Sequence, residues 1–341
     1  MPRKPKRKPV NLALQGGGAH GAYTWGVLDR LLQEDSLAIE AISGTSAGAV
    51  NAVVLASGLA TGGIAGARER LRGFWKAVGA SASLSPVRRM PWQRASDGWS
   101  LDSSPAFLFF DLISRVASPY DLNPMNFNPL RHLLDEHVDW QALRSCNDIK
   151  LFISATSVHT GKVRIFHTDD VTADAVMASA CVPHLFQAVE IDGEPFWDGG
   201  FSGNPSLWPF FYDTESRDIV IVQINPIERR ETPKTARGIL NRVNEITFNA
   251  SLLKELRAID FVSRLVEDGV LDGKDYKDLR IHRVACDALL NELQSSSKLN
   301  AEWPFLQHLY EIGSNAAALW LETDGAHVGR RSSVDIRAMF G

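Results

Sequence analysis

The sequence predicts an α/β fold with a mainly parallel central sheet and helices on both faces. The first observation is the alternation of a short apolar strand, a glycine-rich turn, a helix, a second strand and a second helix over residues 10–56, which is typical of parallel βαβ units. The second is a set of strand candidates at residues 150–156, 163–166 and 219–224, the last of them rich in Val and Ile, each bounded by turn-forming residues. With 341 residues and 45% hydrophobic side chains, the chain is long enough for one large domain or two smaller ones.

The chain begins with a proline-rich basic segment, residues 1–9, that contains no acidic residue. Such a segment is expected to be disordered. Two roles are open for it, contact with anionic lipid head groups or service as a solubilising leader. The next apolar run, residues 10–14, is too short for a signal peptide or a membrane-spanning helix. We therefore expect any membrane contact to be peripheral.

Cysteine content and net charge restrict the compartment and the partners. The three cysteines, at positions 146, 181 and 286, are too few and too far apart for a disulfide framework, which favours a reducing, cytoplasmic compartment. The net charge is −4, and we expect no nucleic-acid partner.

The first strand, at residues 10–15, ends in the glycine-rich run Gly16 to Gly21, and a helix follows from about residue 22. Successive N–H groups at Gly17 and Gly18 can converge on one oxygen atom, because no side chain obstructs them. The same run matches the dinucleotide-binding pattern G-x-G-x-x-G. That alternative needs an acidic residue at the end of the second strand, whereas Glu40 is expected at its start.

The second strand, around residues 39–42, leads into Gly44-Thr45-Ser46-Ala47-Gly48 and then a helix-forming run. This is a G-x-S-x-G nucleophile elbow in a strand-turn-helix context. A Cβ atom at Gly44 or Gly48 would crowd the neighbouring strand and helix. The pattern predicts Ser46 as a nucleophile, with the N–H of Ala47 available to a developing oxyanion. The alternative is a Gly/Ser-rich turn without chemistry.

A long segment at residues 81–128 is rich in Pro, Ser and aromatic residues. An insertion of this length in an α/β domain is either a lid over an apolar pocket or a structural arm with its own small core. We expect the lid.

A general base for Ser46 is predicted at Asp198, which is followed by Gly199 and Gly200 and preceded by Phe196 and Trp197. The two glycines allow close approach of a second loop, and the aromatic side chains would desolvate the carboxylate and raise its proton affinity. An ordinary aspartate is a weak base, so this desolvation is needed. Taken alone, Asp-Gly-Gly is a common turn motif.

The last third of the chain is predicted to be largely helical, over residues 236–265 and 286–321. These helices would pack on the sheet or against a partner, and the first of them would suit a homodimer interface. A Ser-His-Asp triad would need His282, His308 or His327, but none lies in a loop that favours catalysis. The histidine spacings do not indicate metal ligands either.

Taken in order, three of these motifs resemble the signatures of the patatin-like phospholipase family: Gly16 to Gly21, Gly44 to Gly48, and Asp198 to Gly200. The segment Met177 to Phe186 is also similar to that family's Ala-Ser-x-Ala-x-Pro-x-x-Phe stretch. The resemblance covers about residues 10–225, and the helical C-terminal third lies outside it.

The resemblance implies a three-layer α/β/α fold and a Ser-Asp dyad that needs no metal or cofactor. Carried over by motif, Ser46 is the nucleophile, Asp198 is the general base, and an oxyanion hole forms at the glycine run, with Gly16, Gly17 and Gly18 as donors beside Ala47. Gly21, Gly44, Gly48, Gly199 and Gly200 complete the motifs. One departure is His20, where family members commonly have Arg or Lys. This departure puts a head-group contact from position 20 in doubt.

The sequence therefore predicts a serine acyl hydrolase that cleaves fatty acyl esters of phospholipids or related lipids. Two alternatives are open: an esterase or polyester hydrolase acting on other esters, and a catalytically silent lipid-binding or scaffold module. The expected organisation is a basic tail (1–9), a catalytic domain (10–225) with its lid insertion (81–128), a helical extension packed on it (226–329) and an exposed tail (330–341).

Overall fold

The computed structural model of the chain describes residues 7–340, apart from 84, 86, 91–97, 115, 147, 230 and 274. Most of the predicted basic tail and part of the predicted lid insertion lie outside the described residues. Arg7, in the described part of the tail, pairs with Asp35 at 2.7 Å.

The strands form one mixed, mainly parallel sheet in the order β5-β6-β3-β2-β1-β7-β8, with β4 also paired to β3. The pairs β1–β2, β1–β7, β2–β3 and β7–β8 are parallel, whereas β3–β4, β3–β6 and β5–β6 are antiparallel. The bounds are β1 Lys8–Leu14, β2 Leu37–Gly44, β3 Lys150–Ser157, β4 Val163–His167, β5 Val189–Ile191, β6 Glu194–Asp198, β7 Asp218–Val222 and β8 Arg280–Val284.

The α-helices are α1 Gly21–Leu31, α2 Ala47–Ala82, α4 Pro105–Ile113, α5 Pro119–Leu122, α6 Pro129–His137, α7 Trp140–Ser145, α8 Ala173–Ser179, α9 Pro209–Asp213, α10 Ala236–Glu267, α11 Asp287–Glu292, α12 Trp303–Thr323 and α13 Ile336–Phe340. Short 3₁₀ helices are η1 Gly18–His20, η2 Thr168–Asp170, η3 Gly199–Phe201, η4 Ser295–Leu299 and η5 Gly325–His327. Side-chain caps fix several helix starts: Asn128, Asp139, Thr172 and Thr235 each accept a bond from an N–H two or three residues further on.

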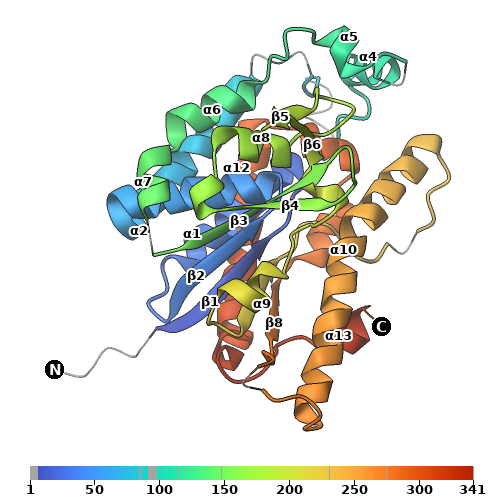
Figure 1. Ribbon diagram of the computed structural model, residues 1–341. Coiled ribbons are helices and arrows are strands. Elements are labelled where there is room, and N and C mark those ends of the chain that lie inside the picture. Colours follow the sequence, from blue (N-terminus) through green and yellow to red (C-terminus); the bar gives the residue numbers. More distant parts are fainter. Residues whose placement is uncertain are drawn as a thin grey trace.

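Helices cover both faces of the sheet (Figure 1), which confirms the predicted three-layer α/β/α fold. The side-chain alternation of the strands produces two cores. Leu12 and Leu14 of β1 face the core that α1, α2 and α12 close, whereas Ala13 faces the core that α9 and α10 close. Because both faces are buried, the strands appear in the sequence as near-continuous apolar runs.

The helix that follows the predicted elbow, α2, is long and apolar enough by composition to span a membrane, the one such helix among the described residues. However, 67% of its apolar window is buried inside the fold. It breaks at Gly63, whose φ is 60°, and its first half packs against the sheet as a core helix. The first half of α2 is therefore a core element of the α/β domain.

The C-terminal third differs from the predicted helical extension because it contributes strand β8, which pairs in parallel with β7 and extends the central sheet. The predicted exposed tail also differs. The N–H of Ser333 donates to the carbonyl of Ile281 at 3.0 Å, and Ile336 and Met339 pack against the second core. The C-terminal segment is fixed because it runs beside the edge strand β8 and bonds to it.

The long helix α10, expected over residues 236–265, is present and has two different halves. Its second half buries Leu252, Leu256 and Ile259 in the core. Its first half leaves Ile239 and Val243 about half exposed. A homodimer interface on this helix stays a prediction, and the exposed first half is where it would lie.

The insertion forms a projection, with α4 and α5 beyond α6 and α8 at one end of the molecule (Figure 1). It exposes many large apolar side chains, namely Leu108, Phe109, Leu112, Val116, Tyr120, Leu122, Met125 and Phe127.

Candidate active site

Ser46 lies on a sharp turn between the end of β2 and the start of α2. Its backbone φ is 53°, a left-handed conformation that costs a non-glycine residue on the order of 1–3 kcal/mol. The flanking glycines are required by close backbone approaches. A Cβ at Gly44 would lie 2.7 Å from the carbonyl oxygen of Gly48, and a Cβ at Gly48 would lie 2.1 Å from that of Leu14.

Strand register brings Asp198 to this turn from more than 150 positions away. Both β2 and β6 pair with β3, where Gly44 lies opposite Ile153 and Asp198 lies opposite Ala155. The end of β2 and the end of β6 therefore meet two residues apart along β3.

The loop that follows Asp198 is tied to the elbow. The hydroxyl of Thr45 donates to the carbonyl of Gly203 at 2.7 Å. A Cβ at Gly199 would lie 2.1 Å from the carbonyl oxygen of Ser154, so the aspartate can end its strand here only if a glycine follows it.

The Asp198 side chain is buried and accepts a hydrogen bond from the backbone. The residue is 2% exposed, and burial raises its pKa to about 6, although the Gly200 N–H, the Ser46 hydroxyl and the charge of Lys298 oppose that rise. The Gly200 bond is 2.7 Å long. Ser46 thus faces a desolvated carboxylate that binds a proton more readily than an exposed aspartate does.

The glycine run presents backbone donors to the same place, but with one difference from the prediction. The Gly16 N–H donates to Asn204 Oδ1 at 2.7 Å, so it is not free to bind an oxyanion. No acceptor is found among the described residues for the N–H groups of Gly17, Gly18 and Ala47. These three remain the candidate oxyanion donors.

The glycine run approaches the elbow closely. A Cβ at Gly16 would lie 2.8 Å from the Ser46 Cβ, and a Cβ at Gly21 would lie 2.7 Å from the Ala47 Cβ. Gly18 has a φ of 59°, a conformation that glycine adopts without strain. The loop therefore depends on glycine for both space and backbone conformation.

His20 is buried behind the loop instead of facing a substrate. The residue is 3% exposed, and its ring packs edge-on against Phe305. Burial, with the nearby charges of Lys298 and Arg229, lowers its pKa to about 3, so the ring is neutral. Because the Ser297 hydroxyl donates its hydrogen to Gln294, it accepts from His20 Nε2 at 2.8 Å. Position 20 does not offer a cation to a head group.

Several supporting side chains were not predicted. Ser179 Oγ accepts from the Ser46 N–H at 2.9 Å, and Asn204 and Asn225 bind the two sides of the Gly16 peptide. Ser179 lies within the Met177 to Phe186 stretch, which could have indicated it. Neither asparagine has a sequence signal beyond its place after a predicted strand or turn.

His282, one of the histidines weighed for a triad, contacts a different serine. Its Nε2 lies 2.9 Å from Asp218 Oδ1 and its Nδ1 lies 3.2 Å from Ser333 Oγ. This buried network joins the C-terminal segment to β7 and β8 and has no contact with Ser46 among the described residues.

Other chemistries weighed from the sequence find no support. Glu40 lies within β2, and its carboxylate accepts from the N–H groups of Glu215 and Ser216. It therefore holds a loop and does not face the glycine run. Among the described residues, no group of three or more His, Cys, Asp or Glu side chains is placed to hold a metal ion.

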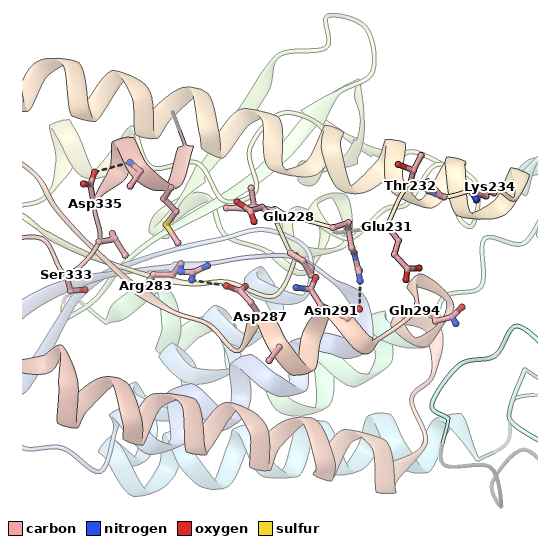
Figure 2. Close-up of a pocket in the computed structure, with 18 residues that line it drawn as sticks. Glu228, Glu231, Thr232, Lys234, Arg283, Asp287, Asn291, Gln294, Ser333 and Asp335 are labelled. Carbon is pink, nitrogen blue, oxygen red and sulfur yellow. Dashed lines mark hydrogen bonds and ion pairs between the residues drawn. The ribbon is translucent and has the colours of Figure 1, made fainter.

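A large cavity of about 1750 Å³ lies apart from the dyad, and its lining includes neither Ser46 nor Asp198. Figure 2 shows it between the segment that follows β7, α11 and the C-terminal segment. Its charged side chains are partly paired, as with Arg283 and Asp287 at 2.9 Å. Cavity size alone therefore does not identify the candidate active site.

A strained serine at a strand-to-helix turn, in contact with a buried carboxylate on a three-layer α/β/α sheet, defines the class of candidate serine acyl hydrolases. The chain belongs to the patatin-like phospholipase family, whose model matches residues 12–211. This membership supports lipid acyl hydrolase activity in general.

Two solved structures are more distantly similar. VipD from Legionella pneumophila is 15% identical, with 90% of this chain and 67% of that chain covered and a TM-score of 0.38. A structure of full-length SpcU in complex with full-length ExoU from the type III secretion system of Pseudomonas aeruginosa is 15% identical, with 89% and 53% covered and a TM-score of 0.30. Both likenesses are too distant to define this chain further. A comparison with curated proteins found no match.

Proposed function

We propose that this protein hydrolyses fatty acyl esters of phospholipids or related lipids through an acyl-enzyme on Ser46, with Asp198 as the general base. The observation that carries the proposal is the strained turn that places Ser46 beside the buried Asp198 carboxylate, whose pKa the Ser46 hydroxyl lowers, next to the N–H groups of Gly17, Gly18 and Ala47.

In the first half-reaction the Ser46 oxygen attacks the ester carbonyl carbon while Asp198 takes the hydroxyl proton. The carbonyl oxygen gains the negative charge, which the free N–H groups and the N-terminus of α2 stabilise. When the tetrahedral intermediate collapses, the bond to the alcohol breaks and Asp198 returns its proton to the leaving oxygen. Water then attacks the acyl-serine, with Asp198 again accepting and returning a proton.

A serine-reactive fluorophosphonate probe tests this assignment directly. The wild type should be labelled on Ser46, and Ser46→Ala should not be labelled. Ser333→Ala is the matched control, because Ser333 contacts a histidine–aspartate pair elsewhere, and it should be labelled like the wild type. A folded wild-type protein that does not react would favour the silent lipid-binding alternative.

Substrate class follows from a second measurement. Release of p-nitrophenol from butyrate, octanoate and palmitate esters, together with hydrolysis of phospholipid vesicles, separates a lipase from a short-chain esterase. We expect activity on long acyl chains and on vesicles. Activity confined to butyrate would favour the esterase alternative.

We expect kcat/KM for a neutral soluble ester to rise with pH through about 6. Burial raises the pKa of Asp198 to about this value, and only the ionised carboxylate accepts the serine proton. The measurement is a pH–rate profile between pH 4 and 9. Glu255→Gln is the control, because burial raises the pKa of Glu255 to about 7 while its carboxylate only holds the N–H groups of Leu207 and Trp208. If the acid limb of the kcat/KM profile moves in Glu255→Gln, the assignment of that limb to Asp198 would be contradicted.

The insertion is suited to select lipid substrates, because it is connected to the segment that holds the base. Gln187 Nε2 donates to the carbonyl of Asn123 at 2.7 Å, and the Cys181 thiol bonds to the Gln187 carbonyl. The carbonyl of Cys181 in turn accepts from the Asp198 N–H at 2.8 Å. A cavity of about 340 Å³ lies at this junction, with Asn126 among its lining residues.

Replacing Leu112 and Phe127 together with serine should lower the rate on phospholipid vesicles about tenfold or more, while leaving p-nitrophenyl butyrate turnover nearly unchanged. Both side chains are well exposed, at 64% and 73%, so the substitutions should not disturb the fold. Two large apolar side chains entering a lipid phase contribute about 1.5–3 kcal/mol each. The control is Val270→Ser, at a site 67% exposed in the turn after α10. An equal loss on both substrates would contradict a lipid-contacting role.

A further inference from the structure

A lysine from the C-terminal third of the chain reaches the candidate active site from outside the residues that match the family model. Lys298 lies in η4, and its ammonium is desolvated by burial, which lowers its pKa. The sequence gives no sign of this placement, because the last site motif ends at Gly200.

The ammonium group is connected to the glycine loop through one asparagine. Lys298 Nζ donates to Asn225 Oδ1 at 2.8 Å, and Asn225 Nδ2 donates to the Gly16 carbonyl at 2.7 Å. Asn225 is fully buried. A lysine can only donate, so its contact with Oδ1 favours the amide orientation in which Nδ2 faces two acceptors, the Gly16 carbonyl and Gln15 Oε1 at 3.3 Å.

Gly16 is also held at its N–H, which donates to Asn204 Oδ1 at 2.7 Å. The Gly16 carbonyl shares one planar peptide with the Gly17 N–H, so its bond to Asn225 fixes the direction of that N–H and the start of the following peptide. Those peptides carry the Gly17 and Gly18 N–H groups, the candidate oxyanion donors.

Lys298 also contacts the loop through its own backbone. A Cβ at Gly18 would lie 2.5 Å from the Lys298 carbonyl oxygen, so η4 packs directly against the second donor. The adjacent residue Ser297 binds His20, the residue that follows the donors by two positions. The segment η4 is therefore the support behind the loop.

The charged and titratable groups around the ammonium are Asp198, Glu245, Arg229 and His20. Glu245 already accepts from Arg229 at 2.7 Å and from Arg242 at 3.2 Å, so it does not need Lys298 for neutralisation. His20 is neutral. The Lys298 charge lowers the pKa of Asp198.

We propose that Lys298 is a positioning residue for the reaction at Ser46, which orients the Gly17 and Gly18 donors through Asn225. Its charge also favours the ionised form of Asp198. This inference rests on the proposed function. It makes the C-terminal third part of the catalytic unit, although the family model ends at residue 211.

The test compares the full-length wild type with Lys298→Met and Lys298→Gln on p-nitrophenyl butyrate. Lys298→Met removes both the donor and the charge. It should lower kcat about 10²-fold with KM nearly unchanged, since small displacements of catalytic groups have effects of this size. It should also move the acid limb of kcat/KM to higher pH. Lys298→Gln keeps a donor but no charge, so it should move the limb similarly while losing less kcat.

Lys277→Met is the matched control, because Lys277 donates to backbone carbonyls of Phe210 and Thr214 and should leave kcat and the limb unchanged. A folded Lys298→Met with wild-type kcat and an unmoved limb would overturn the proposal. If Lys298→Met does not fold, Lys298→Gln tests the charge, and an acid limb at the wild-type pH would overturn the effect of that charge. The donor role is then tested by Asn225→Asp, which loses the Nδ2 donor. A wild-type kcat in Asn225→Asp would overturn the donor role.

Ser46→Ala on the same substrate separates this proposal from the proposed function. If Ser46→Ala keeps its activity, the proposed function is wrong and the Lys298 role falls with it. If Ser46→Ala is inactive and Lys298→Met is fully active, only the role of Lys298 is wrong.

Discussion

Replacing Ser46 with alanine is expected to lower kcat for ester hydrolysis by about 10⁶-fold, the effect seen when the nucleophile of a serine hydrolase is removed. No covalent intermediate can then form, and the oxyanion donors alone provide only a small residual acceleration. The measurement is p-nitrophenol release under saturating butyrate ester, with the limit set by the no-enzyme blank.

The fold of this variant should be unchanged. Ser46 already has a φ of 53°, and alanine meets the same backbone strain at this position. The N–H bond to Ser179 Oγ does not involve the side chain that is lost. Thermal unfolding should therefore match the wild type. A variant that keeps even a tenth of the wild-type rate would place the nucleophile elsewhere, and Ser333→Ala would be the next variant to measure.

The parts of the fold that were predictable from sequence are those whose causes are local. The elbow needs Gly44 and Gly48 because a Cβ there would meet backbone atoms within a few residues or on the adjacent strand. The apolar runs of β1 and β7 follow from burial on both faces of the sheet. These requirements appear in the sequence directly, and the structure confirms them.

The parts that were not predictable depend on partners far along the chain. Gly16 was expected to donate to the oxyanion, but Asn204, 188 positions away, takes its N–H. The run at residues 279–284 is strand-like in sequence, but its place as β8 in the central sheet, within the predicted helical extension, depends on pairing with β7. Lys298 belongs to the same group, since no spacing rule connects it to Asp198.

His20 lies within a family motif, but the side chain at this position is a neutral, buried histidine and not a cation. The family pattern commonly has a cation there, and a histidine could have been charged. Burial against Phe305 and the nearby cations instead lower its pKa to about 3. The charge of Lys298, which no motif places here, lowers the pKa of Asp198 instead.

Replacing Asp198 with asparagine is the second large change, and it should act on activity and stability in opposite directions. The variant keeps the side-chain shape but loses the group that accepts the Ser46 proton. We expect kcat to fall by about 10⁴-fold, the upper part of the range for general base catalysis. The acid limb near pH 6 should disappear with it. The same pH–rate assay measures both.

The stability change follows from the raised pKa of Asp198. Its folded-state pKa of about 6 lies above the ordinary 3.8, so folding favours the protonated acid. The contribution of this preference to the free energy of unfolding is fully present below the ordinary pKa of 3.8 and is lost as the pH rises through about 6. At pH 8 the wild type therefore carries a penalty of about 3 kcal/mol. Asparagine has no charge to desolvate, so Asp198→Asn should unfold at a higher temperature than the wild type at pH 8 and lose that advantage near pH 4. A variant less stable than the wild type at pH 8 would mean that the ionised carboxylate stabilises the fold, and desolvation would then not explain its strength as a base.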